Sequence, residues 1–251
     1  MTMLTEWRNG HESKSLPSTV FVAFPGVGNV GKVALTSVRN IESTVEVARL
    51  HPVGLPPLAE LDEDGLLSPP HYSLASTTTS NGTSFLTLIG KGQPNEPGQQ
   101  SSLAREMMEF FQSNGINQII VLAGLISKPE DKLIFAVASS SSHRIDLEAM
   151  GVDVRRDEPK NGAIGLAALL ASMGPLYDLN SACIITSSVG NSEDTMGAQR
   201  KLERLNDWFD LGLTLPNDGS DWLKERLNAL APGPKEDLVK ELTSSHDAFY
   251  M

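Results

Sequence analysis

The sequence predicts an α/β protein with a mostly parallel or mixed sheet, helices on both faces of that sheet, and a C-terminal helical tail. Between residues 19 and 213, short apolar segments rich in β-branched residues alternate with amphipathic segments. The chain has 251 residues, of which 40% are hydrophobic, so it can bury a sizeable core. We therefore expect a flexible N-terminus at 1–17, an α/β core at 18–214 and a helical tail at 215–251.

The first half of the core is expected to contain four strands, one helix and a long loop. Residues 19–24 are apolar and are followed by Pro25-Gly26, which is typical of a buried strand. Asn81-Gly82 is a strong hairpin signal, so the two strands beside it are expected to be antiparallel. The expected elements are strands at 19–24, 45–50, 71–78 and 84–89, a helix at 29–40, and a structured proline-rich loop at 51–70.

In the second half of the core, apolar segments expected to form strands again alternate with segments expected to form helices. Leu103, Met107 and Phe110 recur at helical spacing, and Asn114-Gly115 ends that helix. Residues 161–173 are apolar nearly all round, which predicts a helix buried on more than one side. The remaining expected elements are strands at 118–123, 133–139 and 182–186, a short helix at 146–150, and an amphipathic helix carrying Ala198, Leu202, Leu205 and Phe209.

The expected tail is divided by two breaks, one at Pro216–Gly219 and the other at Pro232–Pro234. Short helices are expected at 220–230 and 235–243. The breaks separate the last residues of the chain from the core.

Charge and composition exclude several classes of function. Lys and Arg number 20 and Asp and Glu number 31, giving a net charge of -11, so general nucleic-acid binding and binding to anionic membranes are disfavoured. The longest apolar run, 119–126, is too short to span a bilayer, and the first residues contain no secretory signal. The single Cys183 excludes an intramolecular disulfide and a zinc site built from several cysteines. We expect a soluble cytoplasmic protein without a metal or cofactor.

Gly26, Gly28 and Gly31 match the glycine pattern of dinucleotide-binding turns, and they lie between an expected strand and an expected helix. The alternative is a tight strand-to-helix turn that needs glycine for close packing. The second expected strand ends in Arg49-Leu50-His51, where an acidic ribose-binding residue would stand. The structural interpretation is therefore favoured, and the three glycines remain the weaker candidate for cofactor binding.

The loop at 187–191 follows an expected strand and precedes a helix, as an anion-binding loop does. It contains no Lys or Arg, so helix capping by Asp194 or Thr195 is the better interpretation. The five histidines show no metal-ligand spacing, and Cys183 lies within an apolar strand where a thiol is inert. The sequence therefore offers no catalytic residue and no metal ligand.

The chain ends in Phe249, Tyr250 and Met251, which is the most selective short motif in the sequence. Packing against the parent domain is one interpretation, because exposed aromatic residues are unfavourable. The other is recognition by a partner, in which a terminal carboxylate pairs with a cation while adjacent side chains fill pockets.

Four segments occur in the chain in the order Phe24–Gly31 (FPGVGNVG), Leu55–Glu60 (LPPLAE), Val121–Leu125 (VLAGL) and Asn161–Leu166 (NGAIGL). This ordered set resembles the proteasome assembly chaperone family, particularly its archaeal-type homologues, and the resemblance covers residues 19–213. The ending resembles the hydrophobic-Tyr-X motif by which proteasome activators and some of these chaperones dock on the proteasome.

This resemblance implies a fold similar to the purine nucleoside phosphorylase type, without enzymatic activity and without a need for ATP. It implies a homo-oligomer that binds α subunits of the proteasome core particle. Phe249 and Tyr250 would then enter the groove between adjacent α subunits, and the carboxylate of Met251 would meet a lysine there. Two alternatives remain open: a nucleotide- or nucleoside-handling enzyme that uses the Gly26–Gly31 turn, and a scaffold whose tail packs on its own core.

Overall fold

The computed structural model describes residues 3–10, 16–61, 65–160, 162–190 and 193–215. The chain divides into two units, residues 1–214 and 215–251. The expected helices at 220–230 and 235–243, and the ending at 249–251, lie outside the described residues. The elements of known structure therefore belong to the first unit.

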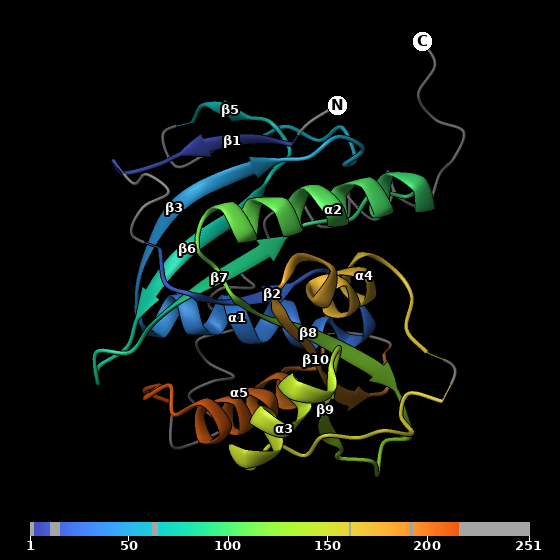
Figure 1. Ribbon diagram of the computed structural model, residues 1–251. Coiled ribbons are helices and arrows are strands. Elements are labelled where there is room, and N and C mark those ends of the chain that lie inside the picture. Colours follow the sequence, from blue (N-terminus) through green and yellow to red (C-terminus); the bar gives the residue numbers. More distant parts are fainter. Residues whose placement is uncertain (1–2, 11–15, 62–64, 161, 191–192, 216–251) are drawn as a thin grey trace. The chain divides into compact units, whose positions relative to one another are not determined.

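The first unit is built on an eight-stranded mixed sheet with the order β1-β3-β6-β7-β2-β8-β10-β9 (Figure 1). Strands β7, β2, β8 and β10 are parallel and form the centre, and antiparallel strands flank them on both sides. The strands are β1 Leu4–Trp7, β2 Thr19–Ala23, β3 Ser43–His51, β6 Tyr72–Thr78, β7 Ser84–Gly90, β8 Gln118–Ile126, β9 Ile134–Ala138 and β10 Asn180–Ser188.

Helices cover both faces of this sheet. Helices α1 and α5 pack against each other on one face, and α2 and α4 pack against each other on the opposite face (Figure 1). The α-helices are α1 Val30–Ile41, α2 Pro97–Ser113, α3 Ser141–Ala149, α4 Leu166–Met173 and α5 Thr195–Phe209, with short 3-10 helices η2 Val27–Asn29 and η3 Gly174–Tyr177. No helix among the described residues is long and apolar enough to cross a membrane.

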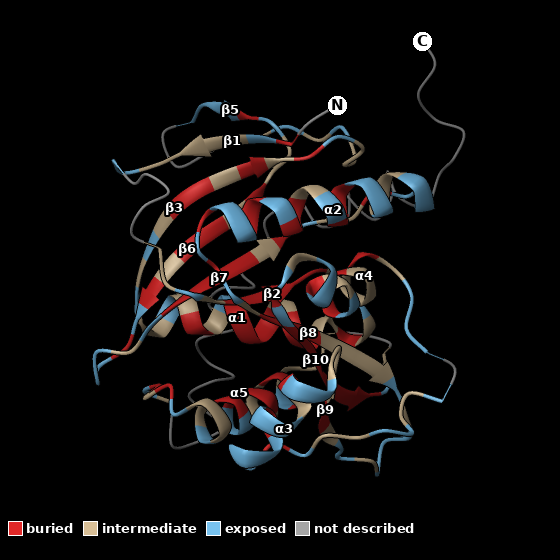
Figure 2. Cartoon of the chain, viewed as in Figure 1, coloured by how far each residue is buried: buried red, intermediate tan, exposed pale blue. Residues whose placement is uncertain are grey.

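Alternation along the central strands produces two apolar layers, because successive side chains of a strand point to opposite faces. Phe21 of β2 faces α5, where its ring meets Phe209 edge-on with centroids 5.7 Å apart. Its neighbours Val20 and Val22 are fully buried in the other layer, together with Leu103 and other residues of α2. Figure 2 shows buried residues along the central strands and on the sheet-facing sides of the helices. The predicted α/β class with helices on both faces is confirmed.

Most predicted elements of the core are present, with boundaries shifted by a few residues. The Asn81-Gly82 hairpin is confirmed, since β6 and β7 pair in antiparallel register from Tyr72↔Gly90 to Thr78↔Ser84. The long loop expected at 51–70 contains a small two-stranded sheet, β4 Glu60–Leu61 with β5 Leu67–Ser68, whose strands are too short for sequence periodicity to reveal.

Three expectations require correction. The N-terminus is not wholly flexible, because Leu4–Trp7 forms β1 on the edge of the sheet, where Trp7 stacks on Phe110 of α2. The helix expected at 161–173 begins at Leu166, because Gly165 has φ 92, a left-handed conformation that a helix cannot contain. The helix expected at 146–150 begins at Ser141, because the Ser140 hydroxyl accepts from the His143 amide and caps it.

Candidate functional site

The residues predicted to dock on a partner, Phe249, Tyr250 and Met251, lie outside the described residues. The described part of the chain does contain the second predicted site, the glycine turn. It also contains three groups that were not predicted from the sequence: a buried lysine, a network of charges on strand β3, and a pocket beside α2.

The turn from β2 to α1 contains Gly26, Gly28 and Gly31. The Asn29 side chain accepts a hydrogen bond from the Gly26 amide, and the Asn29 amide donates to the Gly26 carbonyl. Gly28 has φ 60, in the left-handed region where glycine is favoured. Its carbonyl accepts a hydrogen bond from the Asp194 amide at 2.8 Å, so the turn is tied to the start of α5.

Two of these three glycines, Gly28 and Gly31, lie so close to other parts of the protein that a side chain would not fit, whereas a Cβ on Gly26 would meet nothing nearer than 4.0 Å. A Cβ atom on Gly28 would lie 2.3 Å from the Ser188 hydroxyl, and one on Gly31 would lie 2.3 Å from the Leu122 carbonyl oxygen. A Cβ atom on Gly124 of β8 would be equally close to the Val27 carbonyl oxygen, at 2.2 Å. The turn after β2 therefore lies in direct contact with β8 and β10, and Gly28, Gly31 and Gly124 serve close packing.

The topology also differs from that of a dinucleotide-binding unit. In such a unit the second strand lies beside the first and carries the ribose-binding acid. Here β3 lies beyond β6 and β7, and the neighbours of β2 are β7 and β8. The Arg49-Leu50-His51 end of β3 is therefore remote from the glycine turn. These observations support the structural interpretation of Gly26, Gly28 and Gly31.

The loop after β10 caps a helix, as predicted. The Asp194 carboxylate accepts a hydrogen bond from the Gly197 amide at 2.6 Å, which makes it the N-cap of α5. The Ser187 hydroxyl donates to the Asp131 carbonyl oxygen and accepts from the Leu133 amide. Asn191 lies outside the described residues. Ser187 thus holds neighbouring loops, and its hydroxyl is not poised as a nucleophile.

Lys201 of α5 is fully buried, which was not predicted from the sequence. Its amine donates to the carbonyl oxygens of Ala123 at 2.7 Å and Ile184 at 3.2 Å, which belong to the adjacent parallel strands β8 and β10. Burial lowers the pKa of this amine to about 7. Burial also raises the pKa of the Cys183 thiol to about 11, so the predicted inert core thiol is supported.

A network of charged residues occupies the α1 side of strands β3, β6 and β7. The Arg39 guanidinium of α1 donates to the hydroxyl and carbonyl oxygens of both Ser73 and Thr87, at 2.6 to 2.9 Å. Ser73 donates to the Glu46 carboxylate at 2.7 Å, and Arg49 pairs with the same carboxylate at 2.9 Å. Burial lowers the pKa of Arg39 to about 10. The network is internally satisfied, so it holds α1 to the sheet.

A β-bulge brings Glu46 and Arg49 together. Residues three apart in a regular strand point to opposite faces, because the side-chain period is two. The register against β6 shifts between Glu46 and Ala48, so Val47 is an extra residue and the two charged side chains share one face. The sequence alone gives no sign of this bulge.

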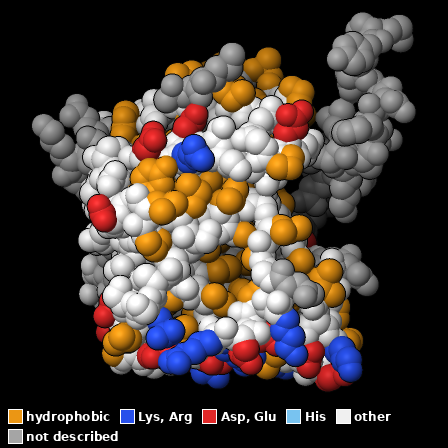
Figure 3. Space-filling view, turned by 45° about the vertical axis from the view of Figure 1, so that its right-hand side comes forward, with side chains coloured by type: hydrophobic (Ala, Val, Ile, Leu, Met, Phe, Trp, Pro, Cys, Tyr) orange, Lys and Arg blue, Asp and Glu red, His pale blue; other side chains and the backbone are white. Residues whose placement is uncertain are grey.

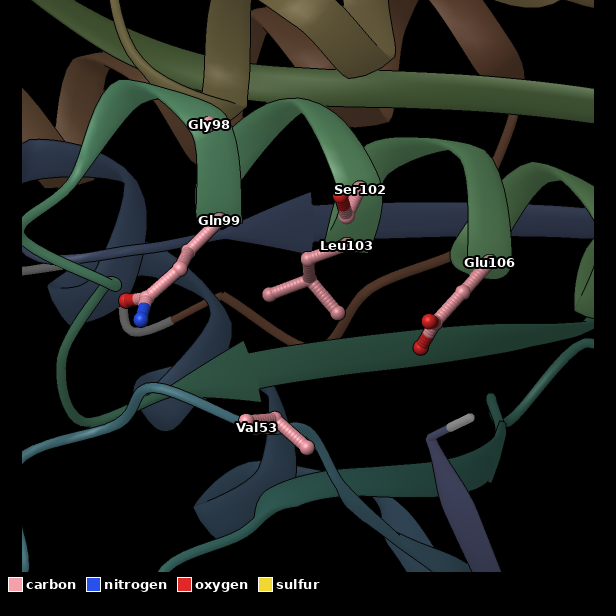
Figure 4. A pocket seen from close by; sticks show the side chains of 6 residues that line it. All are labelled: Val53, Gly98, Gln99, Ser102, Leu103 and Glu106. Atoms are coloured by element: carbon pink, nitrogen blue, oxygen red, sulfur yellow. The ribbon is translucent and has the colours of Figure 1, made fainter. Parts of the chain in front are cut away.

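A pocket of about 240 Å³ opens between α2 and the loop that follows β3 (Figure 4). Leu103 and Val53 supply its apolar part, and Glu106 supplies a carboxylate that accepts the Met3 amide at 2.7 Å. Its volume is below the ~300 Å³ of the smallest usual ligand pockets. Within the described residues, no group of three His, Cys, Asp or Glu side chains could hold a metal ion. The lining residues are Val53, Gly98, Gln99, Ser102, Leu103 and Glu106.

The sequence model of the PAC2 family matches residues 20–225, which include almost the whole sheet and its helices. The chain belongs to the PAC2 family. Among curated proteins, none is significantly similar in sequence to this chain.

Three solved structures with the same fold match between 85% and 96% of this PAC2 chain. PbaB of Pyrococcus furiosus, described as an archaeal proteasome activator, has a TM-score of 0.73 at 17% identity and is matched over 96% of this chain and 99% of its own. PbaA of the same organism, described as an archaeal homolog of proteasome-assembly chaperone, has a TM-score of 0.66 at 20% identity, and the match covers 85% of this chain and 91% of PbaA. A Mycobacterium tuberculosis proteasome-assembly chaperone homologue has a TM-score of 0.62 at 14% identity, and the match covers 86% of this chain and 96% of the homologue.

PAC2 membership confirms the family resemblance seen in the ordered segments of the core. Phe24–Gly31, Val121–Leu125 and the end of the fourth segment all lie in or beside the central strands. They do not bear on the ending at 249–251, which lies beyond the matched residues.

Proposed function

We propose that this PAC2 protein is a non-enzymatic, ATP-independent binding protein or assembly chaperone for the proteasome. Its partner would be the α-ring of the core particle, and its anchor would be the ending Phe249-Tyr250-Met251. The observation that carries the proposal is the combination of the PAC2 match over residues 20–225 with this ending. The similarity in fold to an archaeal proteasome activator over 96% of the chain supports it.

The chemistry of the ending suits a narrow groove between two subunits. Phe249 and Tyr250 would bury their rings there, and the terminal carboxylate of Met251 would pair with a lysine of the partner. The Met251 side chain would contribute least. One such contact buries little area, so a single tail would bind weakly.

Several tails on one oligomer would bind far more tightly than one. Once the first tail is bound, the others act at a high effective concentration, which raises the overall affinity by ~10²–10⁴-fold if their spacing matches the ring. The net charge of -11 would add long-range attraction toward a basic ring surface, and added salt would weaken that attraction.

No observation favours the enzyme alternative. The glycine turn is packed against Ser188 and Leu122, the Ser187 hydroxyl is engaged by loop backbone, and β3 does not adjoin β2. A nucleotide titration followed by calorimetry tests this directly. Binding in the micromolar range that Gly28→Val abolishes without unfolding the protein would restore the enzyme hypothesis.

The decisive experiment measures binding of the full chain to purified core particles. Deletion of residues 249–251, or Tyr250→Ala, is expected to abolish binding while the circular dichroism spectrum and oligomer mass stay unchanged. Met251→Ala is the matched control, since it keeps both rings and a terminal carboxylate, and it is expected to bind within about threefold of wild type. Undiminished affinity after the deletion would eliminate the tail as the anchor.

A further inference from the structure

The pocket beside α2 is a groove whose helical residues form one stripe. Ser102, Leu103 and Glu106 follow Gln99 by three, four and seven residues, so all four share one side of α2. Val53, in the loop after β3, lies opposite them (Figure 4). Seven residues of helix rise by about 10 Å, so the carboxamide of Gln99 and the carboxylate of Glu106 lie at the two ends of the stripe. We call this feature the α2 groove.

The α2 groove combines an apolar middle with one charge. Leu103 and Val53 supply the apolar surface between its ends. Among its lining residues, Glu106 alone is charged. The Oε2 atom of Glu106 accepts the Met3 amide at 2.7 Å, and within the described part of the chain its Oε1 atom has no hydrogen-bond partner. One carboxylate oxygen is therefore left to bind a donor inside the groove.

The charges near the α2 groove favour a cationic ligand. The other charged residues of α2 and its N-cap are Glu96, Arg105 and Glu109, which are exposed and do not line the groove. Lys91, after β7, is paired with Glu60. On the face seen in Figure 3, most Lys and Arg side chains lie along the lower edge, below the level that α2 occupies in Figure 1. The net charge of -11 would attract a basic partner over a longer range.

We propose that the α2 groove binds the side chain of a lysine residue in a partner protein. The four-carbon stem would lie along Leu103 and Val53, and the ammonium group would donate to the Oε1 atom of Glu106. The peptide group of the same lysine would reach the carboxamide of Gln99 at the other end. A groove with an apolar middle and a carboxylate at one end matches a long apolar stem that carries one terminal cation.

The free oxygen of Glu106 also selects lysine over arginine. A guanidinium group is bound best by both oxygens of a carboxylate, and here the Met3 amide occupies one of them. An ammonium group is a compact charge that one oxygen can bind. The volume of about 240 Å³ is small for a free ligand, but a single side chain needs less space.

One lysine bound in this way would be a weak contact, with a dissociation constant of about 1 mM for an isolated residue. It would act as one anchor within a larger interface. The α2 groove belongs to the described core, whereas the proposed proteasome anchor is 249–251. Each can therefore be removed without the other.

The test is a ligand-detected NMR titration of the full-length protein with Nα-acetyl-lysine amide. Saturable binding is expected, and Nα-acetyl-norleucine amide, which has the same stem without the ammonium group, should bind at least about tenfold more weakly. Glu106→Gln should weaken lysine binding by about tenfold or more, because it removes the charge while its amide oxygen can still accept the Met3 amide. Ser102→Phe changes an exposed position and should abolish binding by filling the groove.

Glu109→Gln is the matched control, since it removes the same charge from an exposed position of α2 outside the groove. It should change the affinity by less than about twofold. The proposal is overturned if lysine amide does not bind, if norleucine amide binds equally, or if folded Glu106→Gln keeps the wild-type affinity. Equal loss in Glu109→Gln would also overturn it.

Two further ligands test the choice of occupant. Nα-acetyl-arginine amide should bind more weakly than the lysine compound, and equal affinity would overturn the selection of lysine. Butylamine has the stem and the ammonium group without a peptide group, so equal affinity would overturn the assignment to a residue within a protein chain. Deletion of 249–251 should leave the titration unchanged, which separates a failure of this proposal from a failure of proteasome docking.

Discussion

The Lys201 amine lies 2.7 Å from the Ala123 carbonyl oxygen, although the lysine belongs to α5 and the alanine to β8. A second bond to Ile184 places the same amine across the β8–β10 pair at the centre of the parallel sheet. A fully buried amine is unfavourable as a cation, and two carbonyl oxygens compensate only in part. The lysine therefore links α5 to the sheet and makes the stability of the fold depend on pH.

The free energy of unfolding is expected to rise as the pH increases from 7 to 9. The folded state holds the pKa of Lys201 at about 7, below its usual 10.5, so between these values the unfolded chain binds more protons than the folded one. The free energy of unfolding rises with pH wherever the unfolded chain binds more protons than the folded one. One group contributes at most about 1.4 kcal/mol per pH unit to this rise. Urea denaturation at several pH values measures it, and Lys201→Met is expected to flatten the slope.

Two substitutions at Lys201 separate charge from packing. Lys201→Met keeps the volume and removes the buried amine, so at pH 6 it is expected to be neutral or stabilising. Lys201→Ala removes the same amine but leaves a cavity, and is expected to lose about 2–4 kcal/mol. Equal losses in both variants would mean that the hydrogen bonds to Ala123 and Ile184 dominate.

Removal of Glu46 is expected to destabilise the fold by about 3 kcal/mol. Glu46→Ala leaves the guanidinium of Arg49 without its partner and the Ser73 hydroxyl without its acceptor, beside the largely buried Arg39. The control is Glu6→Gln, which loosens the pair between Glu6 and Arg8. Those side chains are about two-fifths exposed, so the change should be below about 1 kcal/mol. Chemical denaturation compares the two, and similar losses would contradict a special role for Glu46.

Sequence periodicity was sufficient for the central strands and for the β6–β7 hairpin, because each has a continuous apolar run or a specific turn signal. It was insufficient for β1. Leu4–Trp7 is only four residues long and lies among polar residues. Its strand conformation is stabilised by pairing with β3 and by the stacking of Trp7 on Phe110, and both partners are distant in the sequence. The start of α3 was missed because serines 139–142 resemble a loop, although Ser140 is its cap.

Some residues of the candidate site could be interpreted from the sequence, and others could not. The structural interpretation of the Gly26–Gly31 turn could be argued from the sequence, since the second expected strand lacks the acidic residue of a dinucleotide site. Lys201 was missed although a signal existed: it is three residues after Ala198 and one before Leu202, on the apolar stripe of α5. Glu46 and Arg49 offered no such signal, because a bulge at Val47 sets their common face.

His143 is expected to make the fold sensitive to acid. It is almost fully buried, and neither ring nitrogen has a hydrogen-bond partner among the described residues. Burial lowers the pKa of His143 below its usual 6.5, against the opposing effect of Asp146. Below pH 6.5 the unfolded chain therefore binds a proton first, and stability falls as the pH drops. In thermal melts from about pH 7.5 to 5, His143→Leu should reduce this loss and Asp146→Asn should enlarge it.

Two unfavourable effects coincide in any substitution of Gly28. Alanine there would adopt a left-handed conformation at φ 60 and would also meet the Ser188 hydroxyl and Asp194. Backbone strain and overpacking together predict a loss of about 2–5 kcal/mol in Gly28→Ala. Gly82→Ala has a similar strain at φ 87 but open space around it, so it should lose about 1–2 kcal/mol.

Adding Ser188→Ala to Gly28→Ala removes the closest clashing atom and should restore about 1 kcal/mol of the loss, measured as a double-mutant cycle in urea. Strain in the backbone would remain, because it does not depend on Ser188. If Gly28→Ala were as mild as Gly82→Ala, the space beside Gly28 would not be filled by Ser188, and the hypothesis that the turn binds a ligand would be favoured again.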